Sequence, residues 1–190
     1  MNCALTTGRK VLCKSNVGGL KASYFASWNN LDHTQAVLVN GELTQFPEQT
    51  FFKWENVSST FTQNITNNEE GLSYNQTLTM RVYTSKNEGK DFFIVNPLRL
   101  VDIRVIVQNN EGYIVMAGFK NGLRLTNYTR STGASHGDFT GYEFTFIGKE
   151  EIPAPTMASV EVPDIELVNN FFFEDKNNFI FQDGVNFIFQ

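Results

Sequence analysis

Residues 58–83 read SSTFTQNITNNEEGLSYNQTLTMRVY, and apolar side chains alternate with polar ones along both halves of this stretch. Phe61 and Ile65 alternate with threonines and asparagines in the first half, and Leu78 begins the same pattern in the second. A period of two residues is typical of strands that bury one face. Residues 67–71 contain turn-forming side chains and two acids. The stretch therefore predicts two long antiparallel strands joined by a polar loop.

Other alternating segments predict further strands. Residues 20–28 alternate and predict a half-buried strand. Residues 35–39 should form a strand that returns through Asn40-Gly41, since Asn-Gly is a strong two-residue hairpin signal. The other expected strands are residues 42–46, 52–55, 102–107, 113–119, 123–128 and 142–147. The predicted fold class is all-β, with antiparallel strands.

One helix is expected, between residues 85 and 100. Ser85 is a suitable N-cap, and Glu88, three residues later, completes a capping box. Pro97 limits the end of this helix, because proline cannot continue the hydrogen-bonding pattern.

Composition limits the functional classes. The 18 phenylalanines, together with many Asn, Thr and Gly residues, favour strands and tight turns. A net charge of -5 without a Lys/Arg cluster argues against a protein that grips nucleic acid, whereas a mildly acidic wall would let duplex DNA slide past. Residues 1–10 lack the apolar core of a signal peptide, and no run of 18 apolar residues occurs. We expect synthesis in the cytosol and no membrane partner.

The sequence offers no pattern of residues that indicates catalysis. Its two histidines and two cysteines lack the spacing of metal, nucleophile or phosphate-binding motifs. Ser131, His136 and Asp138 lie in one glycine-containing loop, but the members of a catalytic triad come from separate segments. A turn in which Asp138 accepts hydrogen bonds from backbone amides is the favoured interpretation. We expect no enzyme activity, no cofactor and no metal.

Both ends of the chain differ from the body, which we place at residues 19–155. Residues 1–18 form an expected N-terminal arm, and free thiols at Cys3 and Cys13 are favoured over a disulfide. Residues 156–190 are expected to form a linker and a β extension with an eight-residue repeat. Each unit would be a short strand in a meander or solenoid, and its apolar faces need cover from the domain or from a neighbouring subunit. The candidate residues of this extension for contact with a neighbouring subunit are Phe171, Phe173, Phe179, Phe181, Phe187 and Phe189.

Two parts of the chain form a recognisable pair of motifs. They are Cys3-Ala4-Leu5-Thr6-Thr7-Gly8-Arg9, Cys13-Lys14 and Val17-Gly18-Gly19-Leu20-Lys21 near the start, then Ala117-Gly118, Asn121-Gly122-Leu123, Thr126, Thr132-Gly133 and Gly137 through Glu150. Together they resemble the major tail proteins, or tail-tube proteins, of bacteriophages. The resemblance covers roughly residues 1–155, and the segment from Gly137 to Ala154 has most of the likeness.

The resemblance implies a β-sandwich or partial barrel with one peripheral helix. It implies six-fold rings in which strands of all subunits form one continuous barrel, and stacking of these rings into a hollow tube for genome delivery. The partners would be further copies of the chain, other phage tail or connector proteins, and duplex DNA that passes without specific binding; the location would be the virion tail. Inter-ring contacts would involve the N-terminal arm and the loop of the long hairpin. The candidate contact residues there are Cys3, Arg9, Cys13, Asn67, Asn68, Glu69 and Glu70.

Two alternatives remain open from the sequence. One is a phage structural protein in another position, such as a connector ring, a capsid decoration or a fibre-associated module. The other is a β-sandwich that binds carbohydrate or a receptor, in which Trp28 and Trp54 would supply a stacking platform. A binding module would stay monomeric and bind a ligand saturably, whereas a tube subunit would form rings.

Overall fold

The computed structural model describes residues 18–28, 32–47, 49–54, 58–68, 71–84 and 96–158, and the backbone of residues 179–180 and 186–187. Strands predominate among these residues, so the expected all-β class is confirmed. The elements are β1 (Leu20–Ser27), α1 (Asp32–Gln35), β2 (Val37–Val39), β3 (Glu42–Gln45), β4 (Phe52–Trp54), β5 (Ser58–Asn68), β6 (Gly71–Tyr83), β7 (Ile103–Asn109), β8 (Ile114–Ala117), β9 (Arg124–Ser131), β10 (Gly141–Glu150), β11 (Thr156–Met157), β12 (Phe179–Ile180) and β13 (Asn186–Phe187).

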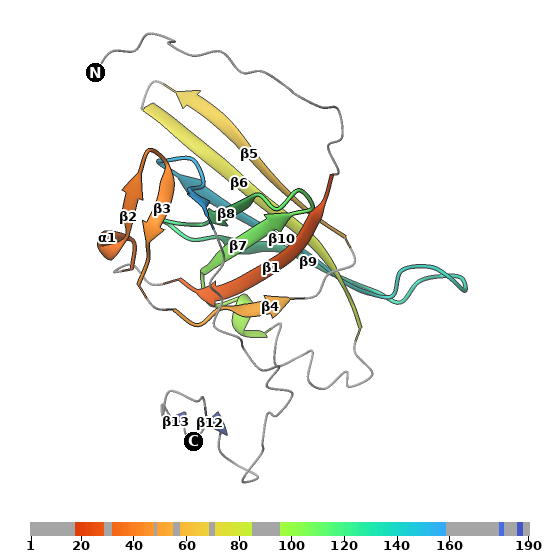
Figure 1. The fold of residues 1–190 in the computed structure, drawn as a ribbon. Coiled ribbons are helices and arrows are strands. Elements are labelled where there is room, and N and C mark those ends of the chain that lie inside the picture. The colour runs from red at the N-terminus through yellow and green to blue at the C-terminus, as the bar shows by residue number, and fades with distance from the viewer. Residues whose placement is uncertain are drawn as a thin grey trace.

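Two sheets make up the body of the molecule. One has seven strands in the order β2-β3-β11-β8-β7-β1-β4, and the other has four in the order β5-β6-β10-β9. The four-stranded sheet contains the longest strands and lies against one face of the seven-stranded sheet (Figure 1). All pairs are antiparallel except β3 with β11.

The long hairpin expected from residues 58–83 is present as β5 and β6. Its register runs without interruption from the pair Ser58 and Arg81 to the pair Asn68 and Gly71. β10 pairs with the other side of β6 over its whole length, and β9 pairs with β10 with one irregularity beside Thr145. The alternation of side chains therefore extends over four strands in a nearly regular sheet.

The core has two parts, one on each face of the seven-stranded sheet. Phe25 and Val105 pack with Leu78 and Phe144 from the other sheet, while Ala26 belongs to a second cluster on the opposite face. The expectation that residues 20–28 form a half-buried strand is therefore wrong. β1 pairs with β7 and β4 inside the sheet, and apolar side chains cover both of its faces.

The Asn40-Gly41 hairpin is confirmed between β2 and β3. Both residues have positive φ, 53° and 85°, which is the conformation that Asn-Gly favours in a two-residue turn.

Several boundaries differ from the sequence-based expectations. The four-residue helix α1 includes Gln35, which we placed in a strand. The expectation of a single helix, within residues 85–100, is therefore wrong. Residues 96–98 are helical, but Ser85 and Glu88 lie outside the described residues. β11 begins at Thr156, where we expected a linker, and it pairs with both β3 and β8. A two-residue strand shows no alternation that the sequence could reveal, because its position in the sheet depends on distant partners.

Candidate functional site

The four-stranded sheet has one apolar and one polar face. Leu78 and Met80 of β6 and Phe144 and Phe146 of β10 are buried in the core. The alternate side chains point away from the core and form rows across the four strands. These rows are Ser58–Arg81–Glu143–Thr129, Thr60–Thr79–Thr145–Asn127, Thr62–Thr77–Ile147–Arg124 and Asn64–Asn75–Lys149. We call this set of residues the polar face, and most of its side chains are hydroxyls or amides.

The charges on the polar face do not match the acidic wall expected from the net charge. The face carries three cations, Arg81, Arg124 and Lys149, and one acid, Glu143. Arg81 Nε donates to Glu143 Oε2 at 2.5 Å. Arg124 donates to both carboxylate oxygens of Asp102, at 2.8 and 2.9 Å, and this raises the pKa of Arg124. Among the described residues, this face therefore has no excess of acids.

β5 is one edge of the four-stranded sheet, and among the described residues no strand pairs with its outer side. Its eleven residues, SSTFTQNITNN, include no charge and no proline, and its pairing with β6 contains no bulge. Lysines, prolines and bulges are the usual features that keep an edge strand from pairing with another chain. A long, regular edge without any of them is therefore a ready surface for adding a strand.

The tip of the β5–β6 hairpin carries apolar side chains that the described residues leave exposed. Ile65 is 64% exposed and Leu72 is 51% exposed, although both follow the alternation that places Leu78 in the core. Gln63 Oε1 joins the hairpin to the body, because it accepts from Ala154 N at 2.7 Å and from Gln76 Nε2 at 3.2 Å. Beyond this point the core side of the hairpin is only partly covered: Tyr74, which pairs with Ile65, is half-buried.

β9 is the opposite edge of the same sheet, and it has a different character. Its pairing with β10 shifts at Thr126, whose Oγ1 donates to Thr145 O at 3.0 Å. Tyr128 lies on the core side in register with Phe144, yet it is 40% exposed. Neighbours in the sheet are antiparallel throughout, so β9 runs opposite to β5.

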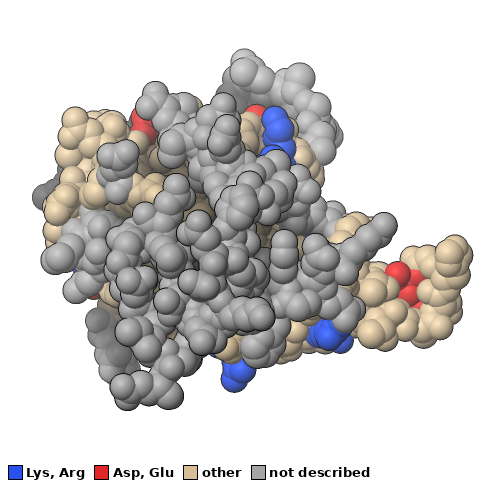
Figure 2. All heavy atoms as spheres, turned by 90° about the horizontal axis from the view of Figure 1, so that it is seen from below, with Lys and Arg blue, Asp and Glu red and all other residues tan. Residues whose placement is uncertain are grey.

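The loop between β9 and β10 extends away from the body (Figures 1 and 2). Asp138 Oδ2 accepts hydrogen bonds from Ala134 N at 2.9 Å and from Ser135 N at 2.7 Å, and these bonds lower the pKa of Asp138. The expected capping role of Asp138 is confirmed. The carboxylate is already used by the backbone, which argues against a triad role with Ser131 and His136.

A shallow hollow of about 630 Å³ lies where this loop meets the sheet. Arg81 and Glu143 contribute from the polar face, and the ring of Phe139 lies 5.6 Å from the Arg81 guanidinium. The hollow combines cations, carboxylates and hydroxyls without a nucleophile and base in hydrogen-bond contact. Its other lining residues are Thr129, Arg130, Ser131, Thr132, Gly133, Ala134 and Asp138.

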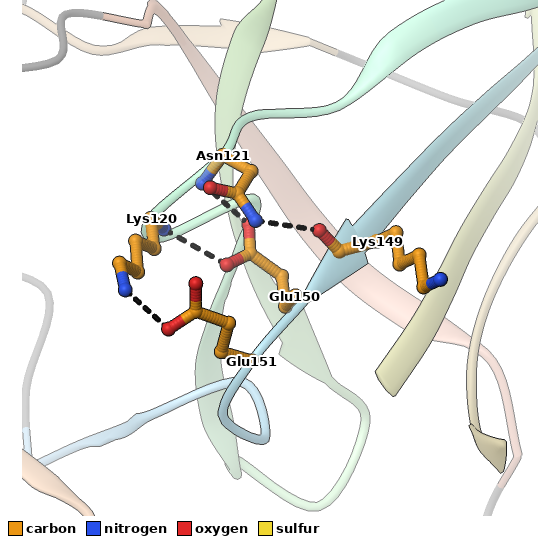
Figure 3. Close-up of polar contacts among 5 residues, drawn as sticks. All are labelled: Lys120, Asn121, Lys149, Glu150 and Glu151. Carbon is orange, nitrogen blue, oxygen red and sulfur yellow. Dashed lines mark hydrogen bonds and ion pairs between the residues drawn. The ribbon is translucent and has the colours of Figure 1, made fainter. Parts of the chain in front are cut away.

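Buried charges hold the β8–β9 turn at the other end of the sheet. Glu150 accepts from Lys120 N at 3.1 Å and from Asn121 N at 2.9 Å, and Lys120 forms an ion pair with Glu151 (Figure 3). Arg104 donates to Phe119 O from two of its nitrogens. Burial raises the pKa of Glu150, while the two amides and Arg104 oppose that rise. These side chains provide hydrogen-bond partners for the backbone groups of the turn, so we assign them a structural role.

The two tryptophans take part in contacts within the molecule. Trp28 Nε1 donates to Lys120 O at 3.1 Å. The Trp54 ring packs against Phe25 and Phe144, at centroid distances of 4.9 and 5.8 Å. Neither indole is fully exposed, so these contacts give little support to a sugar-stacking platform.

The predicted contact residues are only partly within the described structure. Asn67 is exposed near the tip of the β5–β6 hairpin, and Asn68 is the last residue of β5. The backbones of Phe179 and Phe187, one repeat apart, are paired in register in the antiparallel β12–β13 pair. Outside the described residues lie Cys3, Arg9, Cys13, Glu69, Glu70, Phe171, Phe173, Phe181 and Phe189.

Sequence reasoning missed the edge of β5 as a site. The signal was present in the lack of any charge between Ser58 and Asn68, but a charge-free strand can also be the centre of a sheet. Within the described ranges, no group of His, Cys, Asp and Glu side chains could hold a metal ion. No helix in those ranges has the length and apolar character needed to cross a membrane.

Comparison with known proteins gives no relative: no family model, no curated protein and no solved structure matches this chain.

Proposed function

We propose that the protein is the major tail-tube subunit of a bacteriophage, a structural virion protein whose copies close into rings and stack into a hollow conduit. The observation that carries the proposal is the long, uncharged and unprotected edge of β5. The resemblance of residues 1–155 to tail-tube proteins supports the same assignment. In this proposal the two sheets, which share one core cluster, form a β-sandwich.

The direction of the strands suits a ring. When copies are related by rotation about one axis, β9 of one copy meets β5 of the next, and these strands run antiparallel. The same contact repeats around the ring until it closes, which leaves no free edge in the four-stranded sheet. The pairing between copies is then of the same type as the pairing within each copy.

The faces of the two edge strands also match. Phe61 and Ile65 of β5 lie on the core side, as does Tyr128 of β9, while Thr60 and Thr129 lie on the polar side. Pairing in this orientation would place the exposed Tyr128 and Ile65 on one side of a continuous sheet. It would bury apolar surface and extend the hydroxyl rows from copy to copy.

The size of such a ring is compatible with the passage of DNA. Six copies would supply about 24 strands, which at ~4.8 Å spacing and a tilt of about 40° give a backbone diameter of roughly 48 Å. Side chains of one sheet face occupy about 5 Å on each side, which leaves an opening wider than a DNA duplex. The polar face would line this opening, because the core side is covered by the seven-stranded sheet.

Negative-stain electron microscopy of the full chain over a concentration series tests the proposal. We expect rings or tubes with a central opening for the wild type and loss of both for Ile65→Lys. The lysine would place an unpaired charge in the proposed contact, while the isolated subunit would tolerate it at a position that is 64% exposed. Ile147→Lys, the same exchange at a 42% exposed position on the polar face of the inner strand β10, is the matched control and should assemble.

Circular dichroism should show that both lysine variants remain folded. A wild-type protein that stays monomeric at high concentration, or equal assembly by Ile65→Lys and Ile147→Lys, would contradict ring closure through β5. A saturable small ligand for a monomer would instead favour a binding module that uses the hollow beside the β9–β10 loop.

A further inference from the structure

Both arginines of the polar face are held by carboxylates. Arg81 is paired with Glu143, its direct cross-strand neighbour, and Arg124 is paired through two hydrogen bonds with Asp102, which precedes β7. Lys149 is the remaining cation of the face.

Stability alone gives a weak reason for these pairs. The side chains of Arg81 and Arg124 are 51% and 74% exposed, and ion pairs between exposed groups contribute little to stability. Arg81 also covers the ring of Phe139, a packing role that depends on its long planar side chain. The arginine is useful to the fold, but its positive charge would face whatever passes the polar face.

An arginine without a carboxylate partner would bind phosphate. Each phosphate contact on duplex DNA releases condensed counterions, and the contacts of several subunits add around a ring. DNA held in this way would not slide freely. A carboxylate beside each arginine removes the attraction while the guanidinium keeps its packing contacts.

We propose that Glu143 and Asp102 neutralise Arg81 and Arg124, so that the polar face does not hold duplex DNA. The inference rests on the proposed function, in which DNA passes along this face. The affinity of the face for DNA is nevertheless a property of a single subunit, and its measurement does not depend on ring formation.

Fluorescence anisotropy with a labelled duplex of arbitrary sequence, at low salt, tests the proposal on the full chain. We expect no saturable binding by the wild type. The double variant Asp102→Asn/Glu143→Gln should bind with an apparent affinity at least about tenfold above the upper limit set by the wild type. For two released arginines, the plot of log K against log salt concentration should have a slope of about -2. Glu143→Gln alone should give about half of that slope, and it keeps the test valid if the double variant does not fold.

The matched control removes two acids elsewhere. Glu42 of β3 and Glu111 of the β7–β8 turn are exposed and belong to the other sheet, so Glu42→Gln/Glu111→Gln has the same net charge as the double variant. This control should not bind DNA. Adding Arg81→Gln and Arg124→Gln to the double variant should abolish the binding it gained.

Three results would overturn the proposal: DNA binding by the wild type, no binding by either folded variant, or equal binding by the Glu42/Glu111 control. Electron microscopy of the same samples separates these outcomes from a failure of the ring proposal. If the protein stays monomeric but its variants bind DNA as expected, the ring proposal is wrong and the neutralisation of Arg81 and Arg124 is supported.

Discussion

Arg104 and Glu150 are the most deeply buried charged residues among those described, at 0% and 1% exposure. Each is satisfied by the backbone of the β8–β9 turn, through Phe119 O for the arginine and the amides of Lys120 and Asn121 for the glutamate. A buried charge is tolerated when hydrogen bonds replace those of water. These residues therefore fix the turn that leads into the edge strand β9.

Replacement of Glu150 by Gln should change how stability depends on pH. Because burial raises the pKa of Glu150, the folded state holds this proton more tightly than the unfolded chain. The contribution of Glu150 to the free energy of unfolding is therefore greatest below its ordinary pKa of 4.5 and falls as pH rises through the higher folded pKa.

Urea unfolding at a series of pH values measures this effect. Glu150→Gln should lower stability at all pH values, because one amide loses its acceptor. The difference from the wild type should narrow as pH rises from about 4 to 7, since only the wild type loses the proton. A difference that widens over this range would show that the carboxylate is stabilised by its partners instead.

Turns are the elements in which local sequence and tertiary contacts separate most clearly. Gly41 and Gly118 both have positive φ, 85° and 66°. A Cβ on Gly41 would meet nothing within 4 Å, whereas one on Gly118 would approach Leu123 N at 2.8 Å and Ile103 O at 2.9 Å. The first glycine is needed only for its backbone conformation, and the second also for close packing against β7.

The variants Gly41→Ala and Gly118→Ala should therefore differ in stability. We expect Gly41→Ala to cost about 1 kcal/mol from its left-handed backbone and Gly118→Ala about 3 kcal/mol or more, because backbone atoms must also move. Chemical unfolding monitored by tryptophan fluorescence suits the comparison, since Trp28 contacts this turn. Equal losses would mean that the backbone around Gly118 adjusts without strain.

At the scale of the whole molecule, the C-terminal repeat has no described contact with either large sheet. β12 and β13 pair only with each other, and a two-stranded pair is marginal by itself. Its phenylalanines would gain stability by packing on another surface. The apolar character of the repeat suits contacts between copies, and so does the edge of β5, with which no further described strand pairs.

A chain that ends at residue 159 should keep the two large sheets and lose the ability to form tubes. We expect far-UV circular dichroism typical of strands and only monomers or short rings by electron microscopy. A full-length control with residues 160–190 replaced by a Gly/Ser sequence separates the effect of the phenylalanines from that of length. Normal tubes from the truncated chain would exclude the repeat from the assembly contact.

Much of the local structure could be predicted from the sequence. The alternation in residues 58–83 located β5 and β6, and Asn40-Gly41 located a hairpin. Asp138 was expected to accept from backbone amides, and it does. Each of these features depends on neighbours a few residues apart, so side-chain periodicity and turn chemistry are sufficient to reveal it.

The all-β class and most of the strands and turns follow from local sequence patterns. The tertiary structure was needed to show that β1 is buried on both faces, that β11 lies between β3 and β8, and that β5 and β9 are the edges of one sheet. The physical reason is that the order of strands follows from pairings between distant segments. A strand at an edge and a strand in the centre of a sheet can have the same local pattern, and only their neighbours in space distinguish them.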